Sequence, residues 1–344
     1  MKITKSLRAK TLIASAVAVA WVAVEQAAVS NPHATVSNPH AVAPAHSGGL
    51  PAPVVTPQDA RQLARLRTAG LRRDGTAVAA LIGSLNDPPH PDHTKTALHS
   101  LARLGATDAI PAIDHTINTG DADTACYARA SKDRLIAEDA ARNVAGAAGT
   151  AVKIDVLYRE LGETPEQINA AVAAHYDNGG NSTDPQPVEV YALRELADIV
   201  YSGAKDSSAM AVLPPNAAAL NFRLDPPAAL KMKIAALPPG MRLPSLIQGL
   251  SQKKMLGADE YFEMQLAADE GLPASRAAAA QLTRMEADRT QVTPDGCIAL
   301  LQVIHAVGDK SQVPLFARLM AGANVEFMYP DVKNGEPQQI VPGY

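Results

Sequence analysis

The sequence predicts an all-α protein, built as an α-solenoid: a superhelical stack of antiparallel helix hairpins that is irregular in its middle. Three observations lead to this prediction. Residues 97–117 align without a gap with residues 300–320. Apolar residues recur every three or four positions, the period of an amphipathic helix. Hydrophobic residues make up 47% of the chain and aromatic residues only 4%. The apolar content is largely Ala, Leu, Val and Ile, and Ala and Leu are strong helix formers.

Each aligned stretch reads as an apolar helix, a glycine break and a second helix with proline near its start. Gly105 corresponds to Gly308 and Pro111 to Pro314. The apolar positions also correspond: Leu101, Leu104, Ile110, Ile113 and Ile117 align with Ile304, Val307, Val313, Phe316 and Met320. A single hairpin cannot bury its apolar face alone, so a repeated hairpin predicts a stack with a shared core.

Residues 1–28 have the three parts of a secretory signal peptide, and we expect them to be removed. Four basic residues precede an uncharged, mostly apolar run over residues 11–24, and Ala27 and Ala28 follow. The run is shorter than the roughly 20 residues that span a membrane. Cleavage predicts an exported protein, periplasmic or extracellular. The alternative is an uncleaved leader that anchors the chain to the outer face of the inner membrane.

Residues 29–55 are expected to form a disordered Pro/Ala/His linker, because the unit 29–35 recurs almost intact at 36–42 and little of it can be buried. Loss of residues 1–28 would change the net charge from −4 to about −7, since four positive charges and one negative charge go with them. A mildly acidic chain is a poor nucleic-acid ligand, because that affinity comes from basic side chains. The single Trp, Trp21, lies in the leader.

Residues 56–201 are predicted to form an N-terminal helical-repeat lobe. A first helix is expected to begin with Thr56 as its cap, and a second capped start is expected at Thr164. After the first helix, the lobe's helices are predicted over residues 76–85, 92–104, 107–118, 151–161, 164–175 and 188–201. Residues 121–144 are predicted to form either one longer helix or a broken one.

Residues 202–256 differ, because proline pairs stand at 214/215, 226/227 and 238/239 and proline is tolerated only in a first helical turn. We predict short helices over 216–222, 228–237 and 244–254. The segment is either an irregular middle of the array or a boundary between two lobes. A C-terminal helical-repeat lobe is expected over 257–321, with an extended tail over 322–344. Its helices are predicted over residues 258–270, 274–289, 295–307 and 312–321.

The phrase Leu-Gly-x-x-x-Ala-Ile-Pro-x-Ile occupies residues 104–113. Through it the chain resembles the HEAT-repeat family, in the short bacterial form related to the phycobilisome-lyase HEAT-like repeats. The second copy has Gln312 where the family usually has Ala, and residues 89–91 enlarge the loop before the first copy. The resemblance implies a curved α-solenoid that binds other molecules through a continuous groove. It carries over no catalytic residue.

The densest group of candidate metal ligands is His90, His93, His99 and His115. Imidazole is a common metal ligand, and these side chains lie in or near one loop and its following helix. The competing interpretation, which we prefer, is a set of solvated surface histidines.

Two further segments are rich in oxygen ligands. Residues 177–184 contain Asp, Asn, Ser and Thr, but they lack the terminal bidentate Glu of the usual calcium loop, so we expect a flexible loop. An acidic group is expected to be a solvated helix face: Asp259, Glu260, Glu263, Asp269 and Glu270. Cys126 and Cys297 lie in predicted helices far apart and are expected to be buried free thiols rather than a disulfide.

We therefore expect an exported HEAT-like repeat protein that acts as a non-catalytic protein-interaction scaffold, with a protein or peptide partner on its concave face. We assign it no enzymatic activity, no catalytic residue, no cofactor, no metal and no nucleic-acid partner. Contact with a membrane is expected only if the leader stays as an anchor. The alternative is a helical-repeat enzyme, or a small-ligand or metal carrier, with a site near His90, His93 and His99.

Overall fold

The computed structural model describes residues 62, 65–67, 69–70, 74–86, 91–182, 184–288, 290 and 292–319. Within these residues all regular secondary structure is helical and there is no strand, so the predicted all-α class is confirmed for this part of the chain. None of the helices described there is both long and apolar enough to cross a membrane. The predicted leader, linker and tail, and also Thr56 and His90, lie outside the described residues; of the first predicted helix the structure describes residues 62, 65–67 and 69–70, which are helical.

The first half of the described chain contains the helices that the apolar periodicity predicts. They are α3 (Val78–Asn86), α4 (Pro91–Leu104), α5 (Ile110–Thr119), α6 (Ala122–Ala140), α7 (Gly146–Leu161), α8 (Pro165–Asp177) and α9 (Val188–Gly203). The predicted cap of α8 is confirmed: the Thr164 hydroxyl accepts from the Gln167 amide at 3.3 Å, and Gln167 Oε1 accepts from the Thr164 amide at 2.7 Å. Of residues 121–144, predicted as one longer helix or a broken one, the structure has a single helix, α6, that ends at Ala140.

The second half continues with α10 (Ala209–Val212), α11 (Pro226–Ala235), α12 (Pro239–Ser251), α13 (Ala258–Ala268), α14 (Leu272–Ala287), α15 (Pro294–Val307) and α16 (Val313–Leu319). The helix predicted over 216–222 is wrong, because residues 215–219 form turns. The side chain of Asn169 holds the backbone of this segment: it donates to the Ala219 carbonyl at 2.8 Å, and its Oδ1 accepts from the Asn221 amide at 2.9 Å. The start predicted for α12 is also wrong: Pro239 begins it, and Pro244 lies inside.

The two aligned glycines have different backbone roles. Gly105 has φ 63°, the left-handed region that favours glycine and that breaks the chain between α4 and α5. Gly308 has φ −74° and ψ 167°. A Cβ at Gly308 would lie 2.3 Å from the Ile304 carbonyl oxygen, so close approach is what requires glycine there.

Two hydrophobic cores meet within α6. The smaller core joins α3, α4 and α5 to one side of α6, and its last residue is Leu135. The larger core takes Ala137 from α6 and continues through α7–α16 to Leu319. The Pro-rich segment 202–256 contributes side chains such as Phe222 and Ile247 to this larger core.

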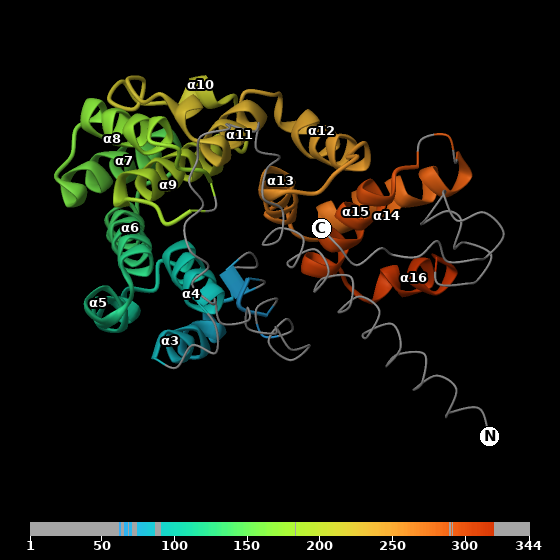
Figure 1. Ribbon diagram of the computed structural model, residues 1–344, viewed down its shortest axis with the longest axis horizontal. Helices are drawn as coiled ribbons and strands as arrows, with labels where there is room; N and C mark the ends of the chain where they lie inside the picture. The colour runs from blue at the N-terminus through green and yellow to red at the C-terminus, as the bar shows by residue number, and fades with distance from the viewer. Residues whose placement is uncertain are drawn as a thin grey trace, which may run out of the picture.

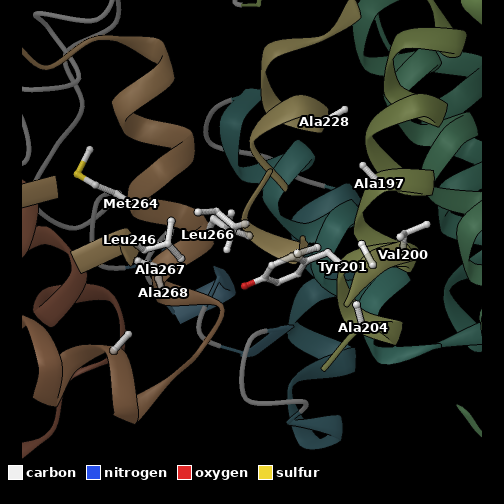
Figure 2. Close-up of a cluster of buried hydrophobic side chains, with 14 of the residues drawn as sticks. Ala197, Val200, Tyr201, Ala204, Ala228, Leu246, Met264, Leu266, Ala267 and Ala268 are labelled. Atoms are coloured by element: carbon white, nitrogen blue, oxygen red, sulfur yellow. The ribbon is translucent and has the colours of Figure 1, made fainter. Parts of the chain in front are cut away.

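Figure 1 shows the helices following one another around an arc, from α3–α5 through α7–α9 and α10–α12 to α13–α16. Inside the arc, α9 lies opposite α13. Figure 2 shows the ring of Tyr201 from α9 extending towards Leu266, Ala267 and Ala268 of α13. The fold therefore places α13, from the second half of the chain, next to α9.

Candidate functional site

Helix α9 is buried on two faces that differ in chemistry. Leu193, Leu196, Ala197 and Val200 pack into the larger core. Another set of α9 side chains is ionisable, and each of them lies three or four residues from at least one other member, so that they share one face of the helix. These are Tyr191, Arg194, Glu195, Asp198 and Tyr201.

Asp198 is the most buried member of this row, with a side chain only 1% exposed. It accepts hydrogen bonds from three cations on three other helices. The donors are Arg103 Nη2 of α4 at 2.8 Å, Lys231 Nζ of α11 at 2.8 Å and Arg134 Nη1 of α6 at 3.3 Å. Burial acts to raise the pKa of Asp198, but these three charges together hold it well below the usual value. The carboxyl is therefore a charged bridge between α4, α6 and α11.

Glu195 lies one turn before Asp198, and its carboxylate also contacts side chains from other helices. Arg134 Nη1 donates to its Oε2 at 3.2 Å, and His99 Nδ1 lies 3.4 Å from its Oε1. Arg134 also donates to Glu138 on its own helix, at 2.7 Å from Nε, and Lys153 of α7 lies 2.6 Å from the same carboxylate. Burial opposes the ionisation of Glu195, but its hydrogen bond with His99 and the neighbouring charges lower its pKa.

Arg103 extends the cluster to the C-terminal half of the chain. Its two terminal nitrogens bond the two oxygens of Asp269, directly after α13, at 2.9 and 2.6 Å. Such a bidentate pair is among the stronger ionic contacts in proteins. We call the following residues the α9 network: His99, Arg103, Arg134, Glu138, Lys153, Glu195, Asp198, Lys231 and Asp269.

Aromatic contacts surround the α9 network. The Tyr127 ring of α6 packs edge-on against Tyr191 of α9, with centroids 4.7 Å apart. The guanidinium of Arg194 lies 5.6 Å from the Tyr191 centroid and 5.7 Å from that of Phe262 in α13. Tyr201 donates to Glu270 Oε1 at 2.7 Å. These contacts join the same helices as the ion pairs do.

A second ionic cluster fixes the start of α11. Asp225 is fully buried and caps the helix by accepting from the Ala228 amide at 3.1 Å. Arg194 donates to both of its oxygens, at 3.0 to 3.2 Å, and the Tyr176 hydroxyl donates at 2.6 Å. The polar groups of α9 thus hold α8 and α11 as well as α4 and α13.

The histidines that the sequence singled out do not converge among the described residues. His99 contacts Glu195, His93 is buried in α4, and His115 is exposed on α5. Within the part of the chain that the structure describes, no group of three His, Cys, Asp or Glu residues could hold a metal ion. The prediction that these histidines are all solvated is wrong for His93, because α4 packs against both α3 and α6.

The other two ligand-rich segments are bonded within the protein. In the 177–184 loop, Asp184 Oδ2 accepts from the backbone amide of Asn181 at 3.0 Å and from its side-chain amide at 2.6 Å. The acidic group after α12 is not a simple solvated face, so that prediction is wrong. Lys253 pairs with Glu260 and Glu263 at 3.3 and 2.5 Å.

Asp269 and Glu270, from the same acidic group, bond Arg103 and Tyr201, and only Asp259 is exposed without such a contact. The partners of these two residues come from α4 and α9, which precede them by more than 60 residues. Periodicity within one helix could not have shown this pairing. Both cysteines are free, as expected, although only Cys297 is fully buried.

Sequence reasoning recognised the apolar side of α9 and missed its polar side. The signal was present, because residues 191, 195 and 198 are spaced by four and three and carry groups that can share one face. The spacing does not show which residues of α4, α6, α11 and α13 are the partners. The chain matches no family model, no curated protein and no solved structure.

The charges of the α9 network balance. Four carboxylates face four permanent cations, and each is within ion-pair distance of an opposite charge. Full pairing offsets much of the cost of burying these ions, and it determines which side chains of the six helices face one another. The arrangement is therefore suited to hold α4, α6, α7, α9, α11 and α13 in register.

Asp133 on α6 is a buried carboxyl outside this network. Its Oδ2 atom has no hydrogen-bond partner. Burial raises the pKa of Asp133 to about 6, although the charge of Arg129 opposes the shift. The nearby Glu160 raises it further. Asp133 therefore costs stability when it is ionised.

Proposed function

We propose that this protein is an exported, non-catalytic scaffold: an α-solenoid of HEAT-like hairpins that binds a protein or peptide partner on the concave side of its arc. The observation that carries the proposal is the arc of successive helices in Figure 1, because such an arrangement offers one extended surface rather than one small cavity. The resemblance at residues 104–113 supports the same class of protein, as an analogy of fold.

The chemistry of the α9 network supports a binding role over a catalytic one. Catalytic acids and bases need a pKa tuned to their task and a proton to exchange. The carboxyl groups of Glu195 and Asp198 instead have lowered pKa values and are held by cations. Their contacts serve to align the helices that carry a binding surface.

The partly exposed members of the α9 network indicate what the partner resembles. The side chain of His99 is 32% exposed, and those of Arg103, Lys231 and Asp269 are 14 to 18% exposed. Cations and a carboxylate thus reach solvent along one set of helices. A polar peptide or protein segment of mixed charge fits this surface better than an apolar one.

Site-specific photo-crosslinking in the native compartment tests this proposal. A crosslinking residue at Lys231 is expected to capture one defined protein, and the same residue at Arg159, exposed on α7, is expected to capture much less of it. The captured protein, once purified, should bind the wild-type chain, and Lys231→Glu should weaken binding at least about tenfold. Equal capture at both positions, or equal affinity of the Lys231→Glu and Arg159→Glu variants, would contradict a concave-side site.

Export is tested separately, by fractionation of cells and by sequencing the N-terminus of the mature chain. We expect the mature protein outside the cytoplasm, beginning near residue 29. Recovery of the uncleaved chain from the cytoplasm would rule out the exported form of the proposal.

A further inference from the structure

Helices α3–α6 form a unit that completes its own core. The buried apolar side chains of that core end at Leu135, and the larger core includes only Ala137 and the half-buried Ile136 from this unit. The contact between the two cores is therefore confined to the C-terminal end of α6. There α6 packs against α7, and the two helices are consecutive in the chain.

The contacts that join this unit to α9, α11 and α13 include many polar and aromatic ones. The α6 side contributes Asp123, Tyr127 and Arg134, and the Tyr191 hydroxyl donates to Asp123 at 2.5 Å. The α4 side contributes His99 and Arg103, as described above. Separation at this boundary would expose mainly ions and hydrogen-bonding groups, which water solvates, together with the rings of Tyr127 and Tyr191, and it would leave most of the apolar side chains of either core covered.

Ions at a buried boundary contribute little net free energy, because the loss of hydration offsets most of their attraction. Opening at such a boundary therefore requires much less free energy than exposure of a core, and folded proteins open first where that free energy is lowest. We propose that the boundary between α3–α6 and the helices α9, α11 and α13 is a conformational joint. The α3–α6 unit turns as one body about the α6–α7 hairpin, and the bonds of Arg103 to Asp198 and Asp269 keep it closed.

This proposal is independent of the proposed partner, and it is tested on the full chain by distance measurement between spin labels. One label replaces His115 on α5 and the other replaces Ala280 on α14, both exposed positions in different units. Cys126→Ser and Cys297→Ala keep the native thiols from reacting. In the wild-type protein we expect one dominant distance, that of the closed state. The open state is expected to be populated to a few per cent or less, which is too little to give a separate peak.

Arg103→Met removes the closing bonds and keeps most of the side-chain volume. We expect it to increase the population with the longer distance at least about tenfold, while far-UV circular dichroism shows unchanged helix content. Asp269→Asn weakens only the pair with Arg103 and leaves the bond between Arg103 and Asp198 in place. It should also increase the population with the longer distance, but to a smaller extent. Lys253→Met is the control, because it breaks ion pairs with Glu260 and Glu263 away from the boundary and should leave the distances unchanged.

Urea provides a second test that does not depend on any variant at the boundary. In the double-labelled protein, the longer distance is expected to appear at urea concentrations below those that reduce the helix signal. Distances that change only together with the helix signal would overturn the proposal, as would an unchanged distribution in a folded Arg103→Met protein.

Discussion

At the scale of single residues, the clearest departure from ordinary behaviour is the carboxyl of Asp133. It is 5% exposed, it lacks a partner for Oδ2, and its pKa is raised to about 6. The folded pKa exceeds the usual 3.8, so the folded state binds more protons than the unfolded state between these values. The contribution of Asp133 to stability is therefore fully present below about pH 4 and is lost as the pH rises through 6.

Asp133→Asn removes this ionisation and should stabilise the protein at pH 7.5 by about 1–3 kcal/mol. The gain should disappear at pH 4, where both proteins are uncharged at this position. Urea unfolding at the two pH values measures the difference. A variant that is less stable than wild type at pH 7.5 would show that Asp133 has a partner that requires its charge.

Arg242 is a second residue whose role is visible only in the structure. Its guanidinium donates to the carbonyl of Ala235 at 2.8 Å and to that of Leu237 at 3.1 Å, and it also bonds the carbonyls of Ala204 and Ser207. These four carbonyl groups lie at or just beyond the C-terminal ends of α9 and α11, where helical carbonyls lack partners within the helix. A lysine ammonium cannot span four acceptors, because it is a compact point charge.

We therefore expect Arg242→Lys to destabilise the protein by about 2–3 kcal/mol, with chemical denaturation as the measurement. The matched control is Arg223→Lys at an exposed position, which should change stability by less than about 0.5 kcal/mol. Equal effects of the two substitutions would contradict the carbonyl-binding role.

At the scale of helices, local sequence rules predict well where a helix end is made by neighbouring residues. The start of α8 is such a case, because the bonds between Thr164 and Gln167 involve only the first turn. At the start of α12 two local signals compete: the proline pair at 238/239 opens the helix, although Pro244 suggests a later beginning. The failed helix over 216–222 differs, because Asn169, more than 40 residues earlier, bonds that segment.

Removal of the α8 cap tests this local account. Thr164→Ala should reduce stability by about 1 kcal/mol, because an amide in the first turn loses its acceptor. Thr119→Ala is a suitable comparison, since the Thr119 hydroxyl bonds only the His115 carbonyl within α5. Thermal unfolding followed by circular dichroism should show the larger decrease for Thr164→Ala, and the opposite order would argue against the cap.

At the scale of the whole molecule, the all-α class and most helices could be predicted, because apolar periodicity is a local property. The α9 network could not. Its members come from α4, α6, α7, α9, α11 and the end of α13, and residues as far apart as Arg103 and Asp269 meet only after the chain has followed the arc. From the sequence alone, a charged residue on a helix is predicted to be solvated, because its partners on other helices are unknown. Asp269 is an example.

The central structural claim is that α9 and its charged neighbours join α4, in the first half of the described chain, to the end of α13, in the second half. A double-mutant cycle between Arg103→Met and Asp269→Asn tests it most directly, with urea unfolding as the measurement. We predict a coupling free energy of about 1–3 kcal/mol between the two positions, because the pair is bidentate and largely buried. Additive effects, within about 0.5 kcal/mol, would show that the two residues do not contact each other in solution and would contradict the account.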